Sequence, residues 1–288
     1  MLYKEYEPEV LRKLQKAEVE ILKDFDALCE KHGIDYFVCG GTAIGGVRHQ
    51  GFIPWDDDID IGMTREDYEH FLKVADSEYG DKYGVINPDR DSSFPAILTK
   101  WYRKGTLFRN QEMIDLGLSI GIAIDIFCFD NVADDVKSLK KQGMRAWVWS
   151  KLLILRQIGS PSLYVEGWKA KLTLLASRLI HGILKVLHLS PSFLYQKAIR
   201  EAEKYRDVHT KRVGYLFDPT PYTSIINKKD IYPTVKRKFE DIELRFPCRV
   251  EKYLERRYGK DYMNLPPEDK RHNHAPEELD FGEAFGDL

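Results

Sequence analysis

The stretch between residues 40 and 62 constrains the fold of this chain more than any other part of its sequence. It begins with the pair Gly40-Gly41 and ends with aspartates at positions 56, 57, 58 and 60. Glycine lets backbone N–H groups come close to a phosphate, and a helix that starts there adds its positive end. Carboxylates are the hard oxygen ligands that Mg²⁺ or Mn²⁺ prefers. The stretch therefore predicts a site for a metal-bound phosphate.

Side-chain alternation selects which of these aspartates act together. Alternate side chains of a β-strand share one face, so Asp58 and Asp60 are expected to point the same way while the isoleucines beside them point into the core. Asp57 would face away, and with Asp56 it is expected either to orient the loop or to bind a second metal ion. Two carboxylates on one face repel each other, so a divalent cation between them is the simplest partner.

A third carboxylate lies about sixty residues later. Residues 121–129 form an apolar run that is typical of a buried strand, interrupted only by Asp125. A buried carboxylate is costly unless it is paired or metal-bound, and a hydrogen-bonded core aspartate is the alternative interpretation. Three carboxylates on neighbouring strands can hold two divalent cations during displacement at phosphorus. Asp58, Asp60 and Asp125 are therefore the predicted catalytic and metal-binding residues.

Five basic residues are candidates for contacting the phosphates of a donor: Arg48, His49, Lys100, Arg271 and His272. The first two lie between the glycine pair and the aspartates, where pairing with a neighbouring aspartate is nearly as well supported. The lysine lies in a predicted strand over residues 96–102, and a solvated lysine is the alternative. The last two belong to a basic loop near the C-terminus, which either touches the donor or decorates the surface.

The order of predicted elements indicates an α/β (α+β) fold. An amphipathic helix over residues 9–32 is followed by a short strand at residues 35–39 that leads into the glycine pair. Further strands and helices favour a small mixed β-sheet flanked by helices, with an additional helical region. We expect residues 1–130 to form the catalytic core, residues 131–210 a basic helical region, and residues 211–288 a C-terminal segment that completes the active site.

The predicted helical region is strongly basic. Residues 137–200 contain 12 lysines and arginines and one acidic residue, Glu166, a net charge of +11, although the whole chain has a net charge of -2. Residues 168–189 place cations among leucines at helical spacing, which predicts a helix on an anionic membrane surface. The alternative is a helix packed on the catalytic core, with its lysine stems along apolar surface.

Length and composition predict a soluble globular protein with a sizeable core. The N-terminus has no secretory pattern, and no apolar run reaches the ~18 to 20 residues of a spanning helix. Four scattered cysteines without a CxxC pair indicate reduced thiols. We expect a cytoplasmic protein, with peripheral contact at the inner face of the membrane through residues 137–200, and no nucleic acid partner.

Together these motifs resemble a known superfamily. A double glycine, an Asp-x-Asp strand and a third carboxylate strand are similar to the nucleotidyltransferase fold of the polymerase-beta type. Within it, residues 48–62, the strand around Asp125 and residues 258–267 resemble the LicD family of phosphocholine transferases, to which the catalytic domains of fukutin and its relative are similar. The resemblance covers about residues 15–275 and is weakest between residues 131 and 235.

The resemblance implies magnesium-dependent transfer of a phospho-substituent. The donor would be a CDP-linked compound, commonly CDP-choline, and the acceptor a hydroxyl of a cell-surface glycan, lipid-linked glycan, lipopolysaccharide or teichoic-acid precursor. Asp58 and Asp60 would be metal ligands, and Asp125 the third ligand or the base for the acceptor hydroxyl. The donor phosphates would be held by Gly40, Gly41 and Thr42.

Two other functions stay open, and the same three aspartates would serve the first of them equally, so that only the released product distinguishes it. A nucleotidyltransferase would attach NMP to a small molecule or protein and release pyrophosphate. A non-catalytic nucleotide or lipid binding module is disfavoured because all three carboxylates are present. A choline head group would need aromatic side chains around its quaternary ammonium, and Trp101, Tyr102 and Tyr222 are among the candidates. The donor head group (choline, ribitol or glycerol), the acceptor and the oligomeric state stay open.

Overall fold

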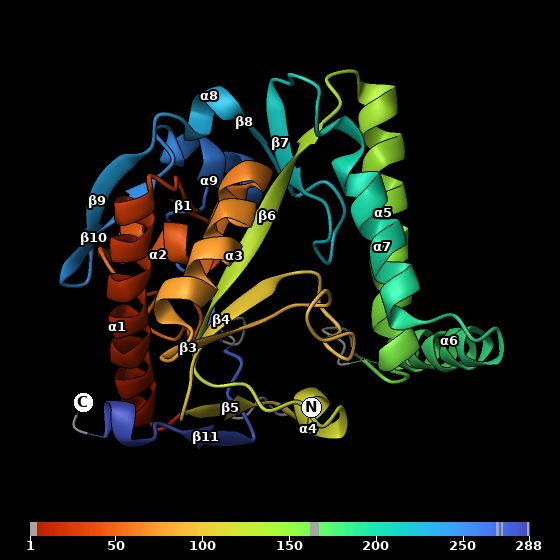
Figure 1. Cartoon of the computed structure of the whole chain (residues 1–288), viewed down its shortest axis with the longest axis horizontal. Helices are drawn as coiled ribbons and strands as arrows, with labels where there is room; N and C mark the ends of the chain where they lie inside the picture. Colours follow the sequence, from red (N-terminus) through yellow and green to blue (C-terminus); the bar gives the residue numbers. More distant parts are fainter. Residues whose placement is uncertain (1–4, 162–166, 269–270, 272, 287) are drawn as a thin grey trace.

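A mixed β-sheet lies at the centre of the molecule (Figure 1). The computed structural model describes residues 5–161, 167–268, 271, 273–286 and 288. The main strands, in spatial order, are β1 (Phe37–Val38), β2 (Asp60–Thr64), β6 (Ala123–Val132), β4 (Thr99–Arg103) and β3 (Tyr83–Ile86). β2 and β6 are parallel, whereas the other neighbours are antiparallel. The predicted mixed α/β fold is confirmed.

Two helices cover one face of this sheet, α1 (Pro8–His32) and α3 (Arg65–Tyr79). Both helices have caps that fix one of their ends. Gly33 ends α1 in the left-handed conformation, and the Thr64 side chain accepts a hydrogen bond from the Asp67 N–H at the start of α3. Trp101 of β4 is only 1% exposed and packs against aromatic rings of both helices. The apolar side chains of the central strands therefore point toward α1 and α3.

Strand register brings the predicted polar residues to the opposite face. Asp60 pairs with Asp125 across the parallel β2–β6 ladder, and Lys100 pairs with Asp125 across the antiparallel β4–β6 ladder. Directly paired residues share a face of the sheet. Ile59 and Ile61, which alternate with the aspartates, are fully buried, as predicted.

The C-terminal third of the chain adds to the same sheet. β7 (Arg212–Tyr215) pairs with the distal half of β6 and with β8 (Ser224–Asn227). The next elements are α8 (Lys228–Ile231), the hairpin of β9 (Val235–Phe239) and β10 (Ile242–Phe246), and α9 (Val250–Tyr258). β9 and α9 pack on α2 (Gly40–His49), and α8 packs on α9 and β8. Residues on either side of the helical region therefore share one core.

A small two-stranded sheet closes one end of the molecule (Figure 1). β5 (Leu107–Arg109) pairs with β11 (Glu278–Asp280), and short helices flank them, α4 (Gln111–Asp115) and η3 (Glu283–Phe285). The Arg109 side chain is paired with Glu278. This contact holds the C-terminal loop beside the face of the main sheet that carries the aspartates.

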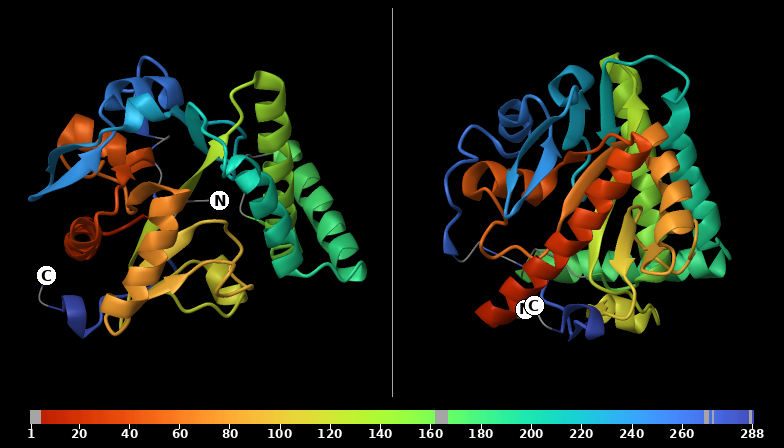
Figure 2. Two further views of the ribbon diagram at one scale, coloured as in Figure 1. Left: turned by 45° about the horizontal axis from the view of Figure 1, so that its top comes forward. Right: turned by 60° about the vertical axis from the view of Figure 1, so that its left-hand side comes forward.

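Residues 136–202 form a helical arm on one side of the sheet. It consists of α5 (Val136–Gln157), α6 (Gly167–Val186) and α7 (Pro191–Ala202), followed by η1 (Glu203–Tyr205). α5 packs against both α6 and α7, and α6 is the outermost of the three (Figures 1 and 2). The predicted helical character of residues 137–200 is confirmed for the described part. No single described helix meets the criteria for a membrane span; residues 170–186 and 191–205, bent by 106°, meet them only as a pair.

Candidate active site

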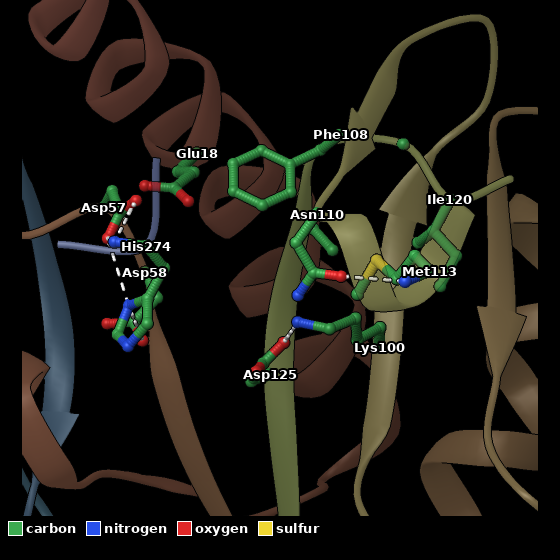
Figure 3. A pocket seen from close by; sticks show the side chains of 12 residues that line it. Glu18, Asp57, Asp58, Lys100, Phe108, Asn110, Met113, Ile120, Asp125 and His274 are labelled. Carbon is green, nitrogen blue, oxygen red and sulfur yellow. Dashed lines mark hydrogen bonds and ion pairs between the residues drawn. The ribbon is translucent and has the colours of Figure 1, made fainter. Parts of the chain in front are cut away.

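Two of the three predicted aspartates, Asp58 and Asp125, line one cavity of about 230 Å³, here called the acidic cavity. Asp60 pairs with Asp125 across the β2–β6 ladder but is not among the lining residues. The charged and titratable lining of the cavity comprises Glu18, Asp57, Asp58, Lys100, Asp125 and His274 (Figure 3). Asp58 lies two residues before the start of β2, and the Asp125 N–H donates to the Ile59 carbonyl over 2.8 Å. The β2–β6 pairing thus extends toward Asp58, which places it on the same face as Asp60 and Asp125.

The glycine pair is required by the carboxylates that pack on it. A Cβ atom on Gly40 would lie 1.8 Å from Oδ2 of Asp60, and one on Gly41 would lie 2.6 Å from Oδ2 of Asp56. Gly40 also has a φ of +52°, which L side chains rarely adopt. The glycine pair forms the first turn of α2, since the helix begins at Gly40.

Backbone donors at this helix start are already engaged within the chain. The Gly41 N–H donates to Oδ2 of Asp60 over 3.1 Å, and the Gly40 N–H donates to the Tyr253 hydroxyl over 2.9 Å. Oγ1 of Thr42 accepts from the Asp60 N–H over 2.8 Å. These contacts fix the position of Asp60. Phosphate binding by Gly40, Gly41 and Thr42 stays a prediction.

Burial and mutual repulsion raise the pKa values of the aspartates. About 36% of the Asp58 side chain is exposed, yet desolvation, followed by repulsion from Asp125 and Asp57, raises its pKa to about 6 against the opposing charge of His274. Burial, followed by repulsion from Asp58 and Asp125, raises the pKa of Asp60 well above its usual range. Burial and the neighbouring aspartates do the same for Asp56. This cluster therefore carries more carboxylates than the cations beside it neutralise.

Lys100 supplies one of those cations. Its Nζ lies 2.5 Å from Oδ1 of Asp125, an ion pair that follows from the β4–β6 register. Burial alone would lower the pKa of Lys100, but Asp125 and the other aspartates raise it above its ordinary value. The lysine is therefore charged and faces the cavity, in the position from which it could contact a bound phosphate.

His274 supplies the second cation and was absent from the predicted site residues. Its Nδ1 lies 3.3 Å from Oδ1 of Asp57 and 3.8 Å from Oδ2 of Asp58. The hydrogen bond to Asp57 is the main reason that the pKa of His274 rises to about 9. Asp57 also accepts from the Tyr6 hydroxyl and from the His274 N–H, and it is only 2% exposed. Asp57 therefore orients the loop, one of the two roles expected for it.

Glu18 is the residue that sequence reasoning missed entirely. It lies on the buried face of α1, is 2% exposed, and its Oε2 has no hydrogen-bond partner in the described part of the chain. In Figure 3 its carboxylate points into the cavity, with Asp57 on one side and the ring of Phe108 on the other. Burial and the nearby aspartates raise the pKa of Glu18 well above its usual range. An acidic residue at a buried position of a mostly apolar helix face was the available signal.

Three of the remaining cationic candidates, Arg48, His49 and Arg271, do not line the acidic cavity. Arg48 donates to the backbone carbonyls of Tyr262 and Asn264, and so ties α2 to the C-terminal segment. His49 is exposed at the opposite end of α2 from the glycine pair, about 12 Å along the helix axis. Arg271 stacks on the ring of Trp55, 4.7 Å from its centroid. His272 lies outside the described residues, and donor binding by these side chains stays a prediction.

The aromatic candidates for a choline site are also elsewhere. Trp101 is buried in the core, the Tyr222 hydroxyl donates to the Lys140 carbonyl on α5, and Tyr102 packs at Gly84. The wall of the acidic cavity is instead apolar on one side, where Phe108, Met113 and Ile120 face the charged residues (Figure 3).

The carboxylates are of the chemical type that a hard cation binds, but their side chains are not arranged around one. Among the described residues, no group of three or more His, Cys, Asp and Glu side chains is arranged to hold a metal ion. Asp58, Asp60 and Asp125 nevertheless share a face and repel one another, as their raised pKa values show for the first two. Carboxylate oxygens in such surroundings are the ligands that Mg²⁺ and Mn²⁺ prefer.

Fold and site together define a nucleotidyltransferase-type phosphotransferase, in which a mixed sheet presents aspartates beside a glycine-started helix. Comparison with known proteins agrees. Residues 33–151 match the family described as "LicD/FKTN/FKRP, nucleotidyltransferase domain". The chain is 30% identical over 271 residues to the lipopolysaccharide cholinephosphotransferase LicD of Haemophilus influenzae, covering 93% of this chain and 97% of that relative. The chain belongs to the LicD family and is a LicD-type phosphotransferase.

More distant relatives match only a short segment. The ribitol 5-phosphate transferase FKRP of human is 37% identical over 60 residues, which is 20% of this chain and 12% of that protein. An uncharacterized protein of Rickettsia typhi is 47% identical over 55 residues, 19% of this chain and 18% of the relative. These two matches are limited to segments of 55 and 60 residues.

Proposed function

We propose that this enzyme transfers phosphocholine from CDP-choline to a hydroxyl group of a cell-surface glycan or a precursor of one. The observation that carries the proposal is the acidic cavity, in a chain that aligns along nearly its full length with a cholinephosphotransferase. The acceptor oxygen would attack the phosphorus that bears choline, the bond from that phosphorus to the CMP oxygen would break, and CMP would leave.

Asp58, Asp60 and Asp125 would hold a Mg²⁺ or Mn²⁺ ion. Such an ion, when bound, stabilises negative charge on phosphoryl oxygens and acidifies a hydroxyl group. The side chains themselves would divide the remaining work. Lys100 would move from Asp125 toward a phosphate oxygen of the donor, which would free Asp125 to accept the proton of the acceptor hydroxyl. His274 would offset the charge of Asp58 and hold the C-terminal loop against the site.

Glu18 and Phe108 would receive the head group. A quaternary ammonium has no hydrogen to donate, so it is recognised by an anionic oxygen and by aromatic faces. Its positive charge would lower the raised pKa of Glu18 and so favour the anionic form of that side chain in the complex. The buried Oε2 of Glu18, which lacks a partner among the described residues, and the Phe108 ring lie in the same cavity. A volume of about 230 Å³ fits a small head group better than a whole nucleotide, since pockets for drug-sized ligands occupy about 300–1,000 Å³. The cytidine would then lie outside this cavity.

The test is a donor assay that follows CMP release. Purified enzyme with Mg²⁺, CDP-choline and a glycan acceptor is expected to release CMP, and Asp58→Asn is expected to lower the rate by roughly 1,000-fold because a charged ligand is lost. The matched control is Asp81→Asn, the same chemical change at an exposed turn.

The released product separates the proposal from its rivals. Pyrophosphate in place of CMP, from nucleoside triphosphates, would identify a nucleotidyltransferase. CMP release that continues in EDTA would remove the metal from the proposal. Release from CDP-ribitol or CDP-glycerol but not from CDP-choline would change the head group and keep the reaction class.

A further inference from the structure

The helix α6 presents a continuous apolar stripe to solvent. Six side chains, spaced by three or four residues, are between 56% and 76% exposed, namely Trp168, Leu172, Leu175, Leu179, Ile183 and Val186. This spacing places all of them on one side of a helix. Single exposed apolar residues are ordinary, but an aligned row of six is typical of a surface that binds something.

The opposite side of α6 is the one that packs on the protein. Leu184 and Ser177 are buried there, and Nδ1 of His181 lies 2.8 Å from the Leu155 carbonyl of α5. The helix therefore uses one face for α5 and leaves the stripe turned outward. α6 is also the outermost element of the helical arm (Figure 2). It packs on α5 and not on the catalytic sheet, which argues against the alternative interpretation of a core-packed helix.

Charge decides which partner fits the stripe. Lys171, Arg178 and Lys185 recur every seven residues and so line one flank of it, and all three are exposed. α6 contains no acidic residue, and residues 137–200 have a net charge of +11. An apolar row with a cationic flank matches the acyl chains and the anionic head groups of a lipid bilayer. It matches a second copy of the same face poorly, because the cations of the two copies would repel.

We propose that the outward face of α6 docks on an anionic membrane surface. The helix would lie in the plane of the membrane, with the six apolar side chains in the acyl boundary and the flanking cations at the head groups. This inference does not depend on the identity of the donor, and it would bring the enzyme to acceptors that are anchored in lipid.

Vesicle flotation tests the apolar part of the docking surface. Full-length protein is expected to bind phosphatidylglycerol-containing vesicles at least 10-fold more tightly than pure phosphatidylcholine vesicles. Leu175→Gln with Leu179→Gln should weaken that binding at least 10-fold, since two leucine side chains are lost from the acyl boundary. The matched control removes two exposed valines outside α6, Val136→Gln with Val208→Gln, and should bind as wild type does.

A second pair of changes tests the charge. Lys171→Gln with Lys185→Gln should weaken binding to anionic vesicles by roughly fivefold for each lysine and leave the weak binding to neutral vesicles unchanged. Unaltered circular dichroism and thermal unfolding will show that each variant is folded. Equal binding of wild type and the leucine variant would overturn the proposal. So would light scattering that shows a dimer, lost in the leucine variant, together with no vesicle binding.

Discussion

The acidic cavity and the helical arm differ in where their charged groups lie relative to water. In the cavity, carboxylates crowd on a buried sheet face, so the pKa values of Asp58 and Asp60 rise. In the arm, lysines and arginines are mostly exposed, and so are the apolar side chains of α6. Buried like charges need a ligand to relieve their repulsion, whereas exposed apolar groups need a surface to cover them. The chain thus has two regions that need a partner. The acidic cavity suits a bound ligand and catalysis, whereas the exposed apolar face of α6 suits attachment to a surface.

A substitution at Gly40 should impair the acidic cavity strongly and leave the helical arm unaffected. Gly40→Ala should lower the rate of CMP release by roughly 100-fold, because a Cβ 1.8 Å from Oδ2 of Asp60 must displace that carboxylate. Vesicle binding through the arm should not change. The matched control is Gly33→Ala, which has a similar positive φ but no atom within 4 Å of the new Cβ. If both substitutions reduce the rate equally, backbone strain explains the loss and the packing argument is wrong.

The head-group assignment predicts a smaller and more selective effect. Glu18→Gln should raise KM for CDP-choline roughly 10-fold, equivalent to about 1.4 kcal/mol, because an amide lacks the anionic oxygen that attracts a quaternary ammonium. KM for a donor with an uncharged polyol head group should stay the same if the enzyme accepts one. Glu20→Gln, an exposed change on the same helix, is the control. A loss of thermal stability without a change in KM would assign Glu18 a structural role.

The smallest predicted effect concerns a partly buried cation of the arm. Lys151 of α5 donates from Nζ to the Phe217 carbonyl over 3.0 Å, and burial lowers its pKa to about 8. The unfolded chain then binds more protons than the folded chain between about pH 8 and the ordinary lysine value near pH 10.4. The free energy of unfolding should therefore rise with pH across this window, by at most about 3 kcal/mol for this residue and by less to the extent that its partly exposed side chain is screened by solvent.

Urea unfolding at several pH values measures that slope. Lys151→Met should flatten it, whereas Lys141→Met, at an exposed position of the same helix, should leave it as in wild type. An identical slope in all three proteins would mean that Lys151 is well solvated. The shifted pKa values that make the free energy of unfolding depend on pH would then belong mainly to the carboxylates of the acidic cavity.

Local pattern was sufficient for the elements that position the aspartates. Alternation predicted that Asp58 and Asp60 share a face, and helical spacing predicted α1 and the helices of the arm. Charge alone was a weaker guide. Arg48 binds backbone carbonyls and His49 is exposed at the far end of α2, although both are neighbours of the aspartates in sequence. Each residue of a helix is displaced by about 1.5 Å along the axis and points in a different direction from its neighbour. Residues that are close in sequence therefore need not reach the same site.

The sequence by itself determined the family, the mixed α/β fold and the run of carboxylates, because these depend on residue type and on periods of two and 3.6 residues. Only the tertiary structure decided which side chains join them. The β4–β6 register placed Lys100 beside Asp125, the packing of α1 brought Glu18 into the cavity, and the β5–β11 pairing delivered His274. Such contacts join residues up to 217 positions apart, as between Asp57 and His274. They depend on strand pairing and helix packing, which no local pattern encodes.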